Sequence, residues 1–494
     1  MEKKVKSCAV HGVDGRMIDV EADVNDGLPV FTMVGYLSSS VRESSERVRT
    51  ALKNSGFHLP PKRITINLSP ADMRKDGSGY DLAIATAVLL SLGVTAELPM
   101  EQTLVLGELS LDGSIKAIPG VLPMVICARE EGMTSCIVPK ENVQEAALVQ
   151  GISVIGVSSL KETMEYIQGI KEYENTNVEQ PAVDTSEYLY DIDFSDVVGQ
   201  ESIKRGMEIA AAGFHNVLLT GAAGAGKSML AKRLPTILPQ MSFEESLEVT
   251  KIYSVGGMLP PEGGLIHRRP FRAPHHTISE YALIGGGRVP TPGEVSFAHY
   301  GVLFLDELPE FSKPVLEVLR QPLEDRRIRI SRVQASYEFP ADFMFVAAMN
   351  PCPCGNYPDY RRCSCTEQQI RRYQSKVSGP LLDRIDIRME VKGVKQEVLF
   401  SKQKTESSKT IRARVEQARQ MQKERFAGTG LLFNSQLDGK NLEEYITLSE
   451  EGKRLVLQLF EEQELSVRGV HRVLKLARTI ADLAGSEEIE HAHL

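Results

Sequence analysis

The strongest chemical signal is a glycine-rich loop that ends in a lysine and a serine. The stretch "NVLLTGAAGAGKSML" fits the pattern G-x-x-x-x-G-K-[ST]. Its residues are Gly221, Ala222, Ala223, Gly224, Ala225, Gly226, Lys227 and Ser228. An apolar run precedes the loop and a helical pattern follows it, which is the context of a phosphate-binding loop rather than of a chance glycine run. In such a loop the backbone N–H groups face phosphates, the lysine reaches the β- and γ-phosphates, and the hydroxyl is a ligand of Mg²⁺. We therefore expect ATP and Mg²⁺ at this loop.

An acidic pair follows a second apolar run, in "GVLFLDELPE". The four apolar residues 302–305 predict a fully buried strand, and Asp306 comes directly after it. By itself the pair would be a solvated strand end. Downstream of a phosphate-binding loop, Asp306 is placed to hold Mg²⁺ and Glu307 to polarise the attacking water, so the pair predicts hydrolysis as well as binding.

Three further polar residues are candidates for the same chemistry. Asn350 follows the apolar run 343–349 and is placed to orient the lytic water. Arg384, in "SGPLLDRIDI", is either one half of a surface ion pair or an arginine that acts on the ATP of a neighbouring subunit. Arg468, or Arg472 one turn later, lies near the start of a C-terminal helix and would reach the γ-phosphate from there.

These residues need a folded frame, and the composition divides the chain into four segments. Residues 1–170 alternate short apolar runs with helical stretches, which is typical of an α/β domain. Residues 171–193 are polar and acidic and are interpreted as a linker. Residues 194–394 predict a second α/β domain, which holds the loop and the acidic pair. Residues 395–494 have helical apolar spacing, which predicts a lid, and we expect the C-terminus to be clipped within another helix.

Together these motifs resemble the AAA+ ATPases. The stretch "RRPFRAPHHTISEYALIGGGRVPTPGEVSFAHYGVLFLDELPEF", with "NPCPCG" and "SGPLLDRIDI", is similar to the magnesium-chelatase-like AAA+ proteins of the ComM/YifB family, and the resemblance covers nearly the whole chain. It implies that Gly221–Ser228 is Walker A and Asp306–Glu307 is Walker B. It also implies that Asn350 is sensor 1, Arg384 the arginine finger and Arg468 sensor 2. An arginine that acts in trans requires a ring, and the family implies a homo-hexamer.

Residues 60–140 resemble the Lon protease domain, in "SPADMRKDGSGYDLAIA" and "LDGSIKAIPGVLPMVICA". A Ser–Lys dyad needs a serine hydroxyl within hydrogen-bond reach of an amine. Gly79 falls at the serine position and Leu122 at the lysine position, whereas Ser78 and Lys116 lie out of register. We therefore expect a ribosomal-S5-like α/β domain kept for structure or interaction, rather than a working protease.

Four of the seven cysteines lie within fourteen residues, at Cys352, Cys354, Cys363 and Cys365. The N-terminus shows no apolar signal segment, so we expect a cytoplasmic protein with reduced thiols, which favours a metal over disulfides. Zn²⁺ is the preferred ion, although each C-x-C pair is tighter than the usual C-x2-C, and an iron–sulfur cluster or free thiols are the alternatives. No carboxylate is placed to activate water at this metal. The site would therefore be structural and would brace the loop between Asn350 and Arg384.

The net charge of −9 repels nucleic acid on average, so DNA binding would need local basic patches. An expected β-hairpin at 323–343 and an insertion at 268–294 carry such groups: Arg326, Arg327, Arg329 and Arg332, and Arg268, Arg269, Arg272, His275 and His276. Any one of these is ordinarily a solvated charge, but two inserted elements facing one channel favour phosphate contacts. The two histidines, as neighbours on one strand, would point apart and make a poor metal chelate. A further basic segment, 351–376, fits a subunit interface, a DNA-facing surface or a plain solvated loop.

The family resemblance implies a hexameric DNA helicase that drives branch migration in homologous recombination and natural transformation. Its partners would be single-stranded or branched DNA, bound without regard to sequence, and recombination proteins. No membrane is expected, because the longest apolar run is too short to span one. Two alternatives stay open: remodelling of a protein partner, as in magnesium chelatase, and ATP-dependent proteolysis, as in Lon. The first is weakened because the sequence shows no integrin-like Mg²⁺ domain.

Overall fold

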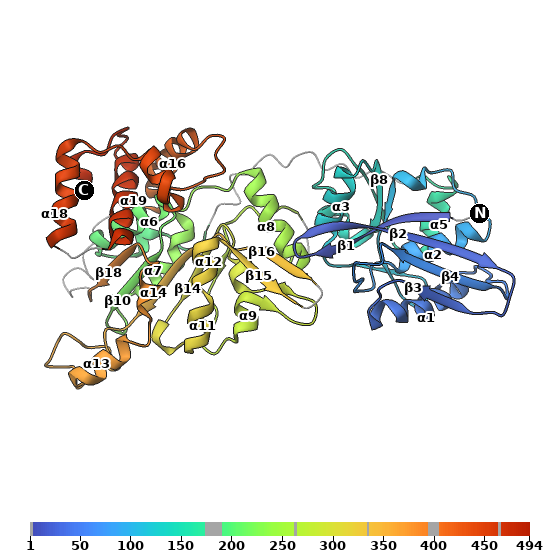
Figure 1. Cartoon of the computed structure of the whole chain (residues 1–494), viewed down its shortest axis with the longest axis horizontal. Coiled ribbons are helices and arrows are strands. Elements are labelled where there is room, and N and C mark those ends of the chain that lie inside the picture. Colours follow the sequence, from blue (N-terminus) through green and yellow to red (C-terminus); the bar gives the residue numbers. More distant parts are fainter. Residues whose placement is uncertain (1–2, 173–189, 261–263, 333–334, 394–404, 463–465) are drawn as a thin grey trace.

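The chain forms two α/β units placed end to end, with a helical region on the far side of the second unit (Figure 1). The computed structural model describes residues 3–172, 190–260, 264–332, 335–393, 405–462 and 466–494. Most of the expected linker 171–193, and the expected boundary between residues 394 and 395, lie outside the described residues.

The first unit is built on a seven-stranded sheet in the order β3-β4-β2-β1-β5-β8-β9. Its strands are β1 (Lys3–His11), β2 (Asp14–Asn25), β3 (Phe31–Val34), β4 (Arg63–Ser69), β5 (Thr103–Val105), β8 (Ser135–Pro139) and β9 (Ser153–Val157). A separate ribbon pairs β6 (Glu108–Leu109) with β7 (Ile115–Lys116). The helices are α1 (Ser39–Asn54), α2 (Asp81–Ser91), α3 (Val121–Glu130), α4 (Val143–Ala146) and α5 (Leu160–Ile167).

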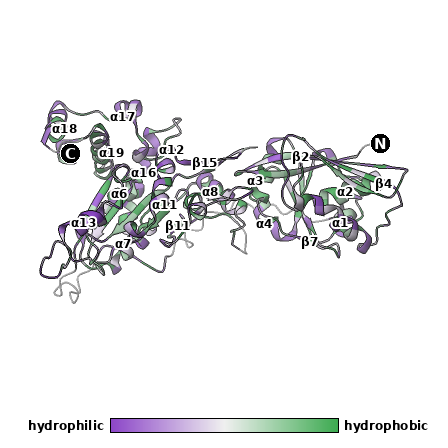
Figure 2. Cartoon of the chain, turned by 60° about the horizontal axis from the view of Figure 1, so that its bottom comes forward, coloured by the Kyte–Doolittle hydropathy of each residue, from purple (hydrophilic) through white to green (hydrophobic). Residues whose placement is uncertain are grey.

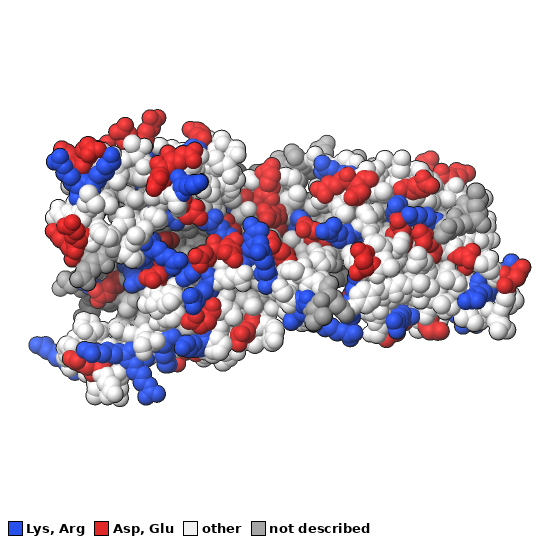
Figure 3. Space-filling model, viewed as in Figure 1, with Lys and Arg blue, Asp and Glu red and all other residues white. Residues whose placement is uncertain are grey.

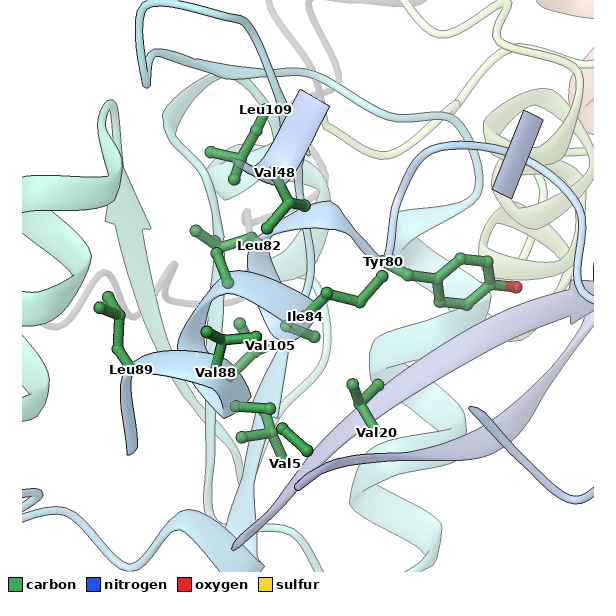
Figure 4. Packing of buried hydrophobic residues seen from close by; sticks show 14 of the residues in the cluster. Val5, Val20, Val48, Tyr80, Leu82, Ile84, Val88, Leu89, Val105 and Leu109 are labelled. Atoms are coloured by element: carbon green, nitrogen blue, oxygen red, sulfur yellow. The ribbon is translucent and has the colours of Figure 1, made fainter. Parts of the chain in front are cut away.

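Helix α2 fills the core of this unit. Ten of its eleven residues are buried, so the longest apolar run of the sequence is a core helix, as expected. Figure 4 shows Leu82, Ile84 and Val88 of α2 packed near Val5 and Val20 of the sheet. Each such side chain contributes roughly 1.5–3 kcal/mol when it is fully buried.

Residues 3–25 form a long antiparallel hairpin. β1 and β2 pair in register from Lys3 opposite Ala22 to His11 opposite Asp14. The lysines of β1 lie at its start, at positions 3, 4 and 6, and Val5 between them is fully buried in the core. Antiparallel sheets commonly pack one face on the core and leave the other in contact with solvent.

The second unit has a five-stranded sheet in the order β11-β14-β17-β10-β18, with every pair parallel. Its strands are β10 (Val217–Gly221), β11 (Phe271–Arg272), β14 (Val302–Leu305), β17 (Met344–Met349) and β18 (Ile387–Val391). Two hairpins lie outside this sheet: β12 (Gly285–Gly286) with β13 (Thr291–Pro292), and β15 (Arg327–Ser331) with β16 (Ser336–Pro340). The helices are α6 (Glu201–Gly213), α7 (Lys227–Arg233), α8 (Phe243–Val255), α9 (Glu280–Ile284), α10 (Glu294–Phe297), α11 (Lys313–Val318), α12 (Arg320–Asp325), α13 (Glu367–Gln374) and α14 (Gly379–Leu382).

The strand order places the motifs side by side. Every residue of β14 and β17 is buried, because helices cover both faces of a parallel sheet. β17 lies between β14 and β10, so Asn350, which follows β17, lies between the acidic pair and the glycine-rich loop. Ligands of open α/β sheets bind at the carboxyl ends of the strands, which is the edge where all three motifs are found.

The C-terminal helices are α16 (Ser408–Arg425), α17 (Gly439–Tyr445), α18 (Glu450–Glu462) and α19 (Val467–Leu483). Of these, α16 and α19 pack on α6 and on each other. The rings of Phe214 and Phe433 stack at 4.4 Å, and Gln436 Nε2 donates to Asp342 Oδ2 at 2.7 Å. Figure 2 shows apolar residues lining the sheets and their covering helices, whereas α13 and α17 are hydrophilic.

The two units meet through α3 and α8. The N–H of Gly120 donates to the carbonyl of Ser254 at 3.0 Å, and the Ser254 hydroxyl donates to the buried carboxylate of Glu145. At the tip of the β1–β2 hairpin, the ring of His11 stacks on Tyr337 of β16 with centroids 4.5 Å apart. The β15–β16 hairpin that the sequence predicts is therefore in contact with the first unit.

Candidate nucleotide site

The glycine-rich loop joins β10 to α7, as the sequence predicts. Gly224 and Gly226 have φ of 76° and 92°, a region that residues with a side chain rarely adopt. Lys227 begins the helix, and its ammonium donates to the carbonyls of Gly221 at 2.7 Å and Ala222 at 2.9 Å. It also donates to Asn350 Oδ1 at 3.0 Å. One cation thus links the loop to the end of β17.

Two oxygen donors come together at the next position of the loop. Ser228 Oγ donates to Asp306 Oδ2 at 2.6 Å, so the hydroxyl of α7 and the carboxylate after β14 are adjacent. Mg²⁺ prefers oxygen ligands and keeps several waters, and this pair fits that preference. Glu307 follows with φ of 52°, and its side chain is 58% exposed, with Oε2 3.9 Å from Nδ1 of His276.

A cavity of about 310 Å³ lies between these groups. It is lined by residues 223–229 of the loop and helix, by Asp306 and Glu307, and by Met349 and Asn350. Burial lowers the pKa of the Lys227 ammonium, while Asp306 and Glu307 act in the opposite direction. The cavity therefore combines a cation, backbone N–H groups and carboxylates in the arrangement that binds a nucleotide with Mg²⁺.

Arg384 and Arg468 lie elsewhere, and they lie together. Both guanidinium groups pair with Glu324 of α12, with Arg468 Nη2 at 3.5 Å from Glu324 Oε1. The three residues line a separate cavity of about 270 Å³, which also includes Arg472. Arg472 Nη1 donates to the carbonyl of Ile385 at 3.1 Å. Neither Arg384 nor Arg468 lines the cavity at the glycine-rich loop.

The ion pair of Arg384 is with a residue far away in the sequence. Asp383 and Asp386 are its nearest acidic neighbours along the chain, but its partner is Glu324, sixty positions earlier. Asp386 instead accepts from the backbone N–H of Asn216 at 3.0 Å and lies beside His215. No spacing rule in the sequence points to Glu324.

The four clustered cysteines converge. One sulfur from each lies within 4.8 Å of all the others, and Cys352 is fully buried. The Sγ atoms of Cys352, Cys354 and Cys363 are separated by 3.4, 3.8 and 3.6 Å. A tetrahedral Zn²⁺ with Zn–S bonds of about 2.3 Å places its sulfurs about 3.8 Å apart, so these residues fit that ion.

The segment that carries the cysteines, residues 351–377, is here called the cysteine lobe. Its base contacts the glycine-rich loop: a Cβ on Gly355 would lie 3.4 Å from the backbone nitrogen of Ala223. Gln374 Nε2 of α13 donates to the carbonyl of Pro351 at 3.0 Å, which closes the base of the lobe. The lobe therefore begins directly beside the nucleotide cavity and projects away from the sheet (Figure 1).

Several basic residues of the insertion are used inside the fold. Arg269 is buried and pairs with Glu245 at 3.1 Å, and Arg272 pairs with Glu294 through two bonds of 2.6 Å. These two arginines stabilise the second unit and do not present their charge to solvent. The interpretation of His275 and His276 as neighbours on one strand is wrong. β11 ends at Arg272, and the two rings lie 4.0 Å apart.

The hairpin arginines are more accessible but partly paired. Arg327 and Arg329 both pair with Glu338 of the opposite strand, at 2.7 and 2.9 Å. Arg332, which follows β15, donates to the carbonyl of Gly287 at 3.1 Å, so the hairpin and the insertion adjoin at this contact. That both elements face one channel stays a prediction.

The Lon-like segment lacks the geometry of a Ser–Lys dyad. Leu122 is fully buried, and a Cβ on Gly79 would lie 3.0 Å from the side chain of Ile118. The hydroxyl of Ser78 donates to Glu108, and in the described part of the chain no hydrogen bond joins it to Lys116.

Comparisons with known proteins place the chain in a family. Residues 193–399 match the family "Magnesium chelatase, subunit ChlI", residues 20–142 match "Subunit ChlI of Mg-chelatase", and residues 405–494 match its C-terminal family. The chain is 40% identical to competence protein ComM of Haemophilus influenzae over 99% of its own length and 95% of that protein. It is 40% identical to YifB of Escherichia coli over the same shares.

A further match covers only part of the chain. Over 33% of its length, the chain is 30% identical to Lon protease 2 of Bacillus subtilis, and the match covers 32% of that protein. The described residues include no helix with the length and apolar character needed to cross a membrane. With full-length matches at this identity and a P-loop cavity on a parallel sheet, the chain belongs to the ComM/YifB family of magnesium-chelatase-like AAA+ ATPases.

Proposed function

We propose that the chain hydrolyses ATP at the cavity between β10 and β14. Lys227 binds the β- and γ-phosphates, the N–H groups of residues 221–226 face the same oxygens, and Asn350 and Glu307 hold the attacking water. Ser228 and Asp306 would hold Mg²⁺, which neutralises charge on the phosphates. The closeness of these side chains to one another supports the assignment.

We propose further that the active form is a ring, a homo-hexamer in which each subunit completes its neighbour's site. One observation carries this: Arg384 and Arg468 share Glu324 at a cavity that is distinct from the nucleotide cavity of their own chain. An ATPase site needs an arginine near the γ-phosphate, and a neighbouring subunit is the natural source. In this assignment both arginines act in trans, so Arg468 does not fold back onto its own nucleotide.

The proposed work of the ring is movement along DNA, with branch migration of recombination intermediates as its outcome and cytoplasmic recombination proteins as further partners. The relative named a competence protein supports a role in the uptake and integration of DNA. The adjoining hairpin and insertion supply candidate phosphate contacts at Arg327, Arg329 and Arg332. We assign residues 1–170 as a proteolytically inactive Lon-like domain and the cysteine lobe as a structural Zn²⁺ site.

The test measures steady-state ATP hydrolysis by the full chain alone, with single-stranded DNA and with forked DNA, alongside sedimentation to count subunits. We expect hexamers whose turnover rises with DNA and which move a labelled three- or four-way junction. A hexamer that ignores every DNA form would instead favour remodelling of a protein partner. Degradation of casein would reinstate the Lon-like alternative.

A further inference from the structure

The cysteine lobe carries a basic surface that the nucleotide site does not use. It has five basic residues, Arg361, Arg362, Arg371, Arg372 and Lys376, against two acidic ones, on a chain whose net charge is −9. Figure 3 shows Lys and Arg side chains gathered over the projection that holds α13. A local excess of this sign is the electrostatic footprint of a polyanion contact.

The arginines of the lobe are available to a ligand. Arg362 pairs with Asp359 at 3.8 Å and Arg371 with Glu367 at 3.6 Å, and the two arginine side chains are 79% and 83% exposed. Exposed pairs at these distances are weak, so a phosphate can replace the carboxylate. Among the described residues, Arg361 and Arg372 form no ion pair with a carboxylate.

An exposed aromatic ring lies next to these charges. Tyr360 is 68% exposed, and its ring lies edge-on to that of Tyr357, with centroids 5.7 Å apart and planes at 86°. A ring of this kind is a platform on which a base can stack, and stacking on an aromatic ring adds to the affinity for a single strand. The combination of aromatic ring and arginines therefore favours a nucleic acid over an acidic protein.

The turn that displays these groups is fixed by its own backbone. The N–H groups of Arg362 and Cys363 both donate to the carbonyl of Asp359, at 3.0 and 2.8 Å. The N–H of Arg361 donates to Asp359 Oδ1 at 3.0 Å, and the sulfur cluster closes the loop behind it. A surface held in this way loses little conformational freedom when it binds.

We propose that Tyr360, Arg361 and Arg362, together with Arg371 and Arg372 of α13, form a binding surface for single-stranded nucleic acid. Tyr360 stacks on a base while the arginines contact the phosphates on either side. This site deepens the proposed DNA motor and rests on it. Because the base of the lobe touches Ala223 through Gly355, the strand would be held next to the nucleotide cavity.

The test measures fluorescence anisotropy of a labelled oligo(dT), with an oligo(U) of equal length as the second arm, titrated with the full-length protein at several salt concentrations. Arg361→Gln/Arg362→Gln should weaken binding and make the plot of log K against log salt shallower by about 1.4, since about 0.7 is lost per phosphate contact on a single strand. Tyr360→Ala should weaken binding about tenfold with the slope unchanged, and Tyr360→Phe should restore it.

The matched control is Lys453→Gln/Arg454→Gln on α18, which removes the same charge from the C-terminal helical region. Thermal melting checks the fold of each variant. If the unaltered protein binds clearly but the variants of the cysteine lobe keep the same affinity and salt slope, this inference is wrong. The proposed DNA motor is not contradicted by that result. If the unaltered protein binds no strand, the proposed DNA motor is wrong as well. Displacement of the oligonucleotide by polyglutamate at equal charge, with no effect of Tyr360→Ala, would assign the surface to an acidic protein instead.

Discussion

The ammonium of Lys227 lies 3.0 Å from the side-chain oxygen of Asn350, so a hydrogen bond joins the glycine-rich loop to the end of β17 across 123 positions of sequence. The same amine reaches two loop carbonyls, which fixes it in the floor of the cavity. In the proposed mechanism, nucleotide binding and water activation are assigned to different side chains around this cation.

Lys227→Ala and Glu307→Gln should separate those two functions. Lys227→Ala removes the cation that meets the β- and γ-phosphates, so ATP binding should be lost. Glu307→Gln keeps the shape of the cavity but removes the group that polarises water, so ATP should bind normally while turnover falls at least about 100-fold. Isothermal titration and phosphate release measure the two quantities. Loss of binding in Glu307→Gln would contradict the assigned roles.

Arg384→Ala should abolish turnover without weakening ATP binding, because the arginine would serve the neighbouring subunit. A loss on the order of 10³-fold is the size expected for an arginine finger. When the Arg384→Ala variant is mixed with inactive Lys227→Ala subunits, activity should return. The first variant supplies an intact loop and the second an intact Arg384, and the two meet at about a quarter of the interfaces of a 1:1 ring. Arg454→Ala on α18 is the control. Mixtures no more active than the separate variants would place Arg384 outside the reaction.

Cys363→Ser should remove a bound metal. We expect one Zn²⁺ per chain in the purified protein by elemental analysis, and none in the variant, because three thiolates with a serine hold the ion poorly. The control variant is Cys127→Ser, which changes a cysteine far from the lobe in sequence. It should keep the zinc bound at the lobe. The base of the lobe lies against the glycine-rich loop, so we also expect the variant to form fewer hexamers by sedimentation. Iron in place of zinc would redirect the assignment to a cluster.

Glu145→Gln tests the contact between the two units through pH. Burial raises the pKa of the Glu145 carboxyl, although the N–H of Leu122 and the hydroxyl of Ser254 oppose the change. A carboxyl with a raised folded-state pKa is fully tolerated below its unfolded pKa of about 4.3 and costs free energy as pH rises through the folded value.

The glutamine variant should therefore unfold at a higher temperature than the natural chain at pH 7, and the gap should close as pH falls toward about 4.3. Calorimetry at several pH values measures this difference, and Glu141→Gln at the exposed neighbouring helix turn is the control. A gap that stays constant with pH would mean that the pKa of Glu145 is the same in the folded and the unfolded chain.

Local patterns predicted the motifs well. The segments Val217–Gly221 and Val302–Leu305 are strands because each is a short apolar run bounded by a loop, and the loop chemistry after β10 is read directly from its glycines. The parallel order that brings Asn350 between them is also typical of such a sheet. The β15–β16 hairpin was predicted for the same reason, since its two strands are close in sequence.

Long-range partners could not be predicted in this way. Glu324 pairs with Arg384 and Arg468 only after α12, α14 and α19 have packed together. Arg269 looked like a solvated charge because nothing in its neighbourhood marks Glu245 as its buried partner. The sequence does not mark the β1–β2 hairpin clearly, because lysines flank the buried Val5 and only the paired strand shows which face is buried.

In the proposed ring, the pairing of two arginines with one carboxylate has a consequence for the subunit that supplies Arg384. Glu324 must release Arg384 before that guanidinium can reach a phosphate of the neighbouring subunit, and the carboxylate then keeps Arg468 as a partner. The remaining ion pair becomes stronger, because the two cations no longer repel each other and no longer compete for the same oxygens. The carboxylate is therefore not left as a lone anion when Arg384 leaves, which lowers the free energy that the exchange costs.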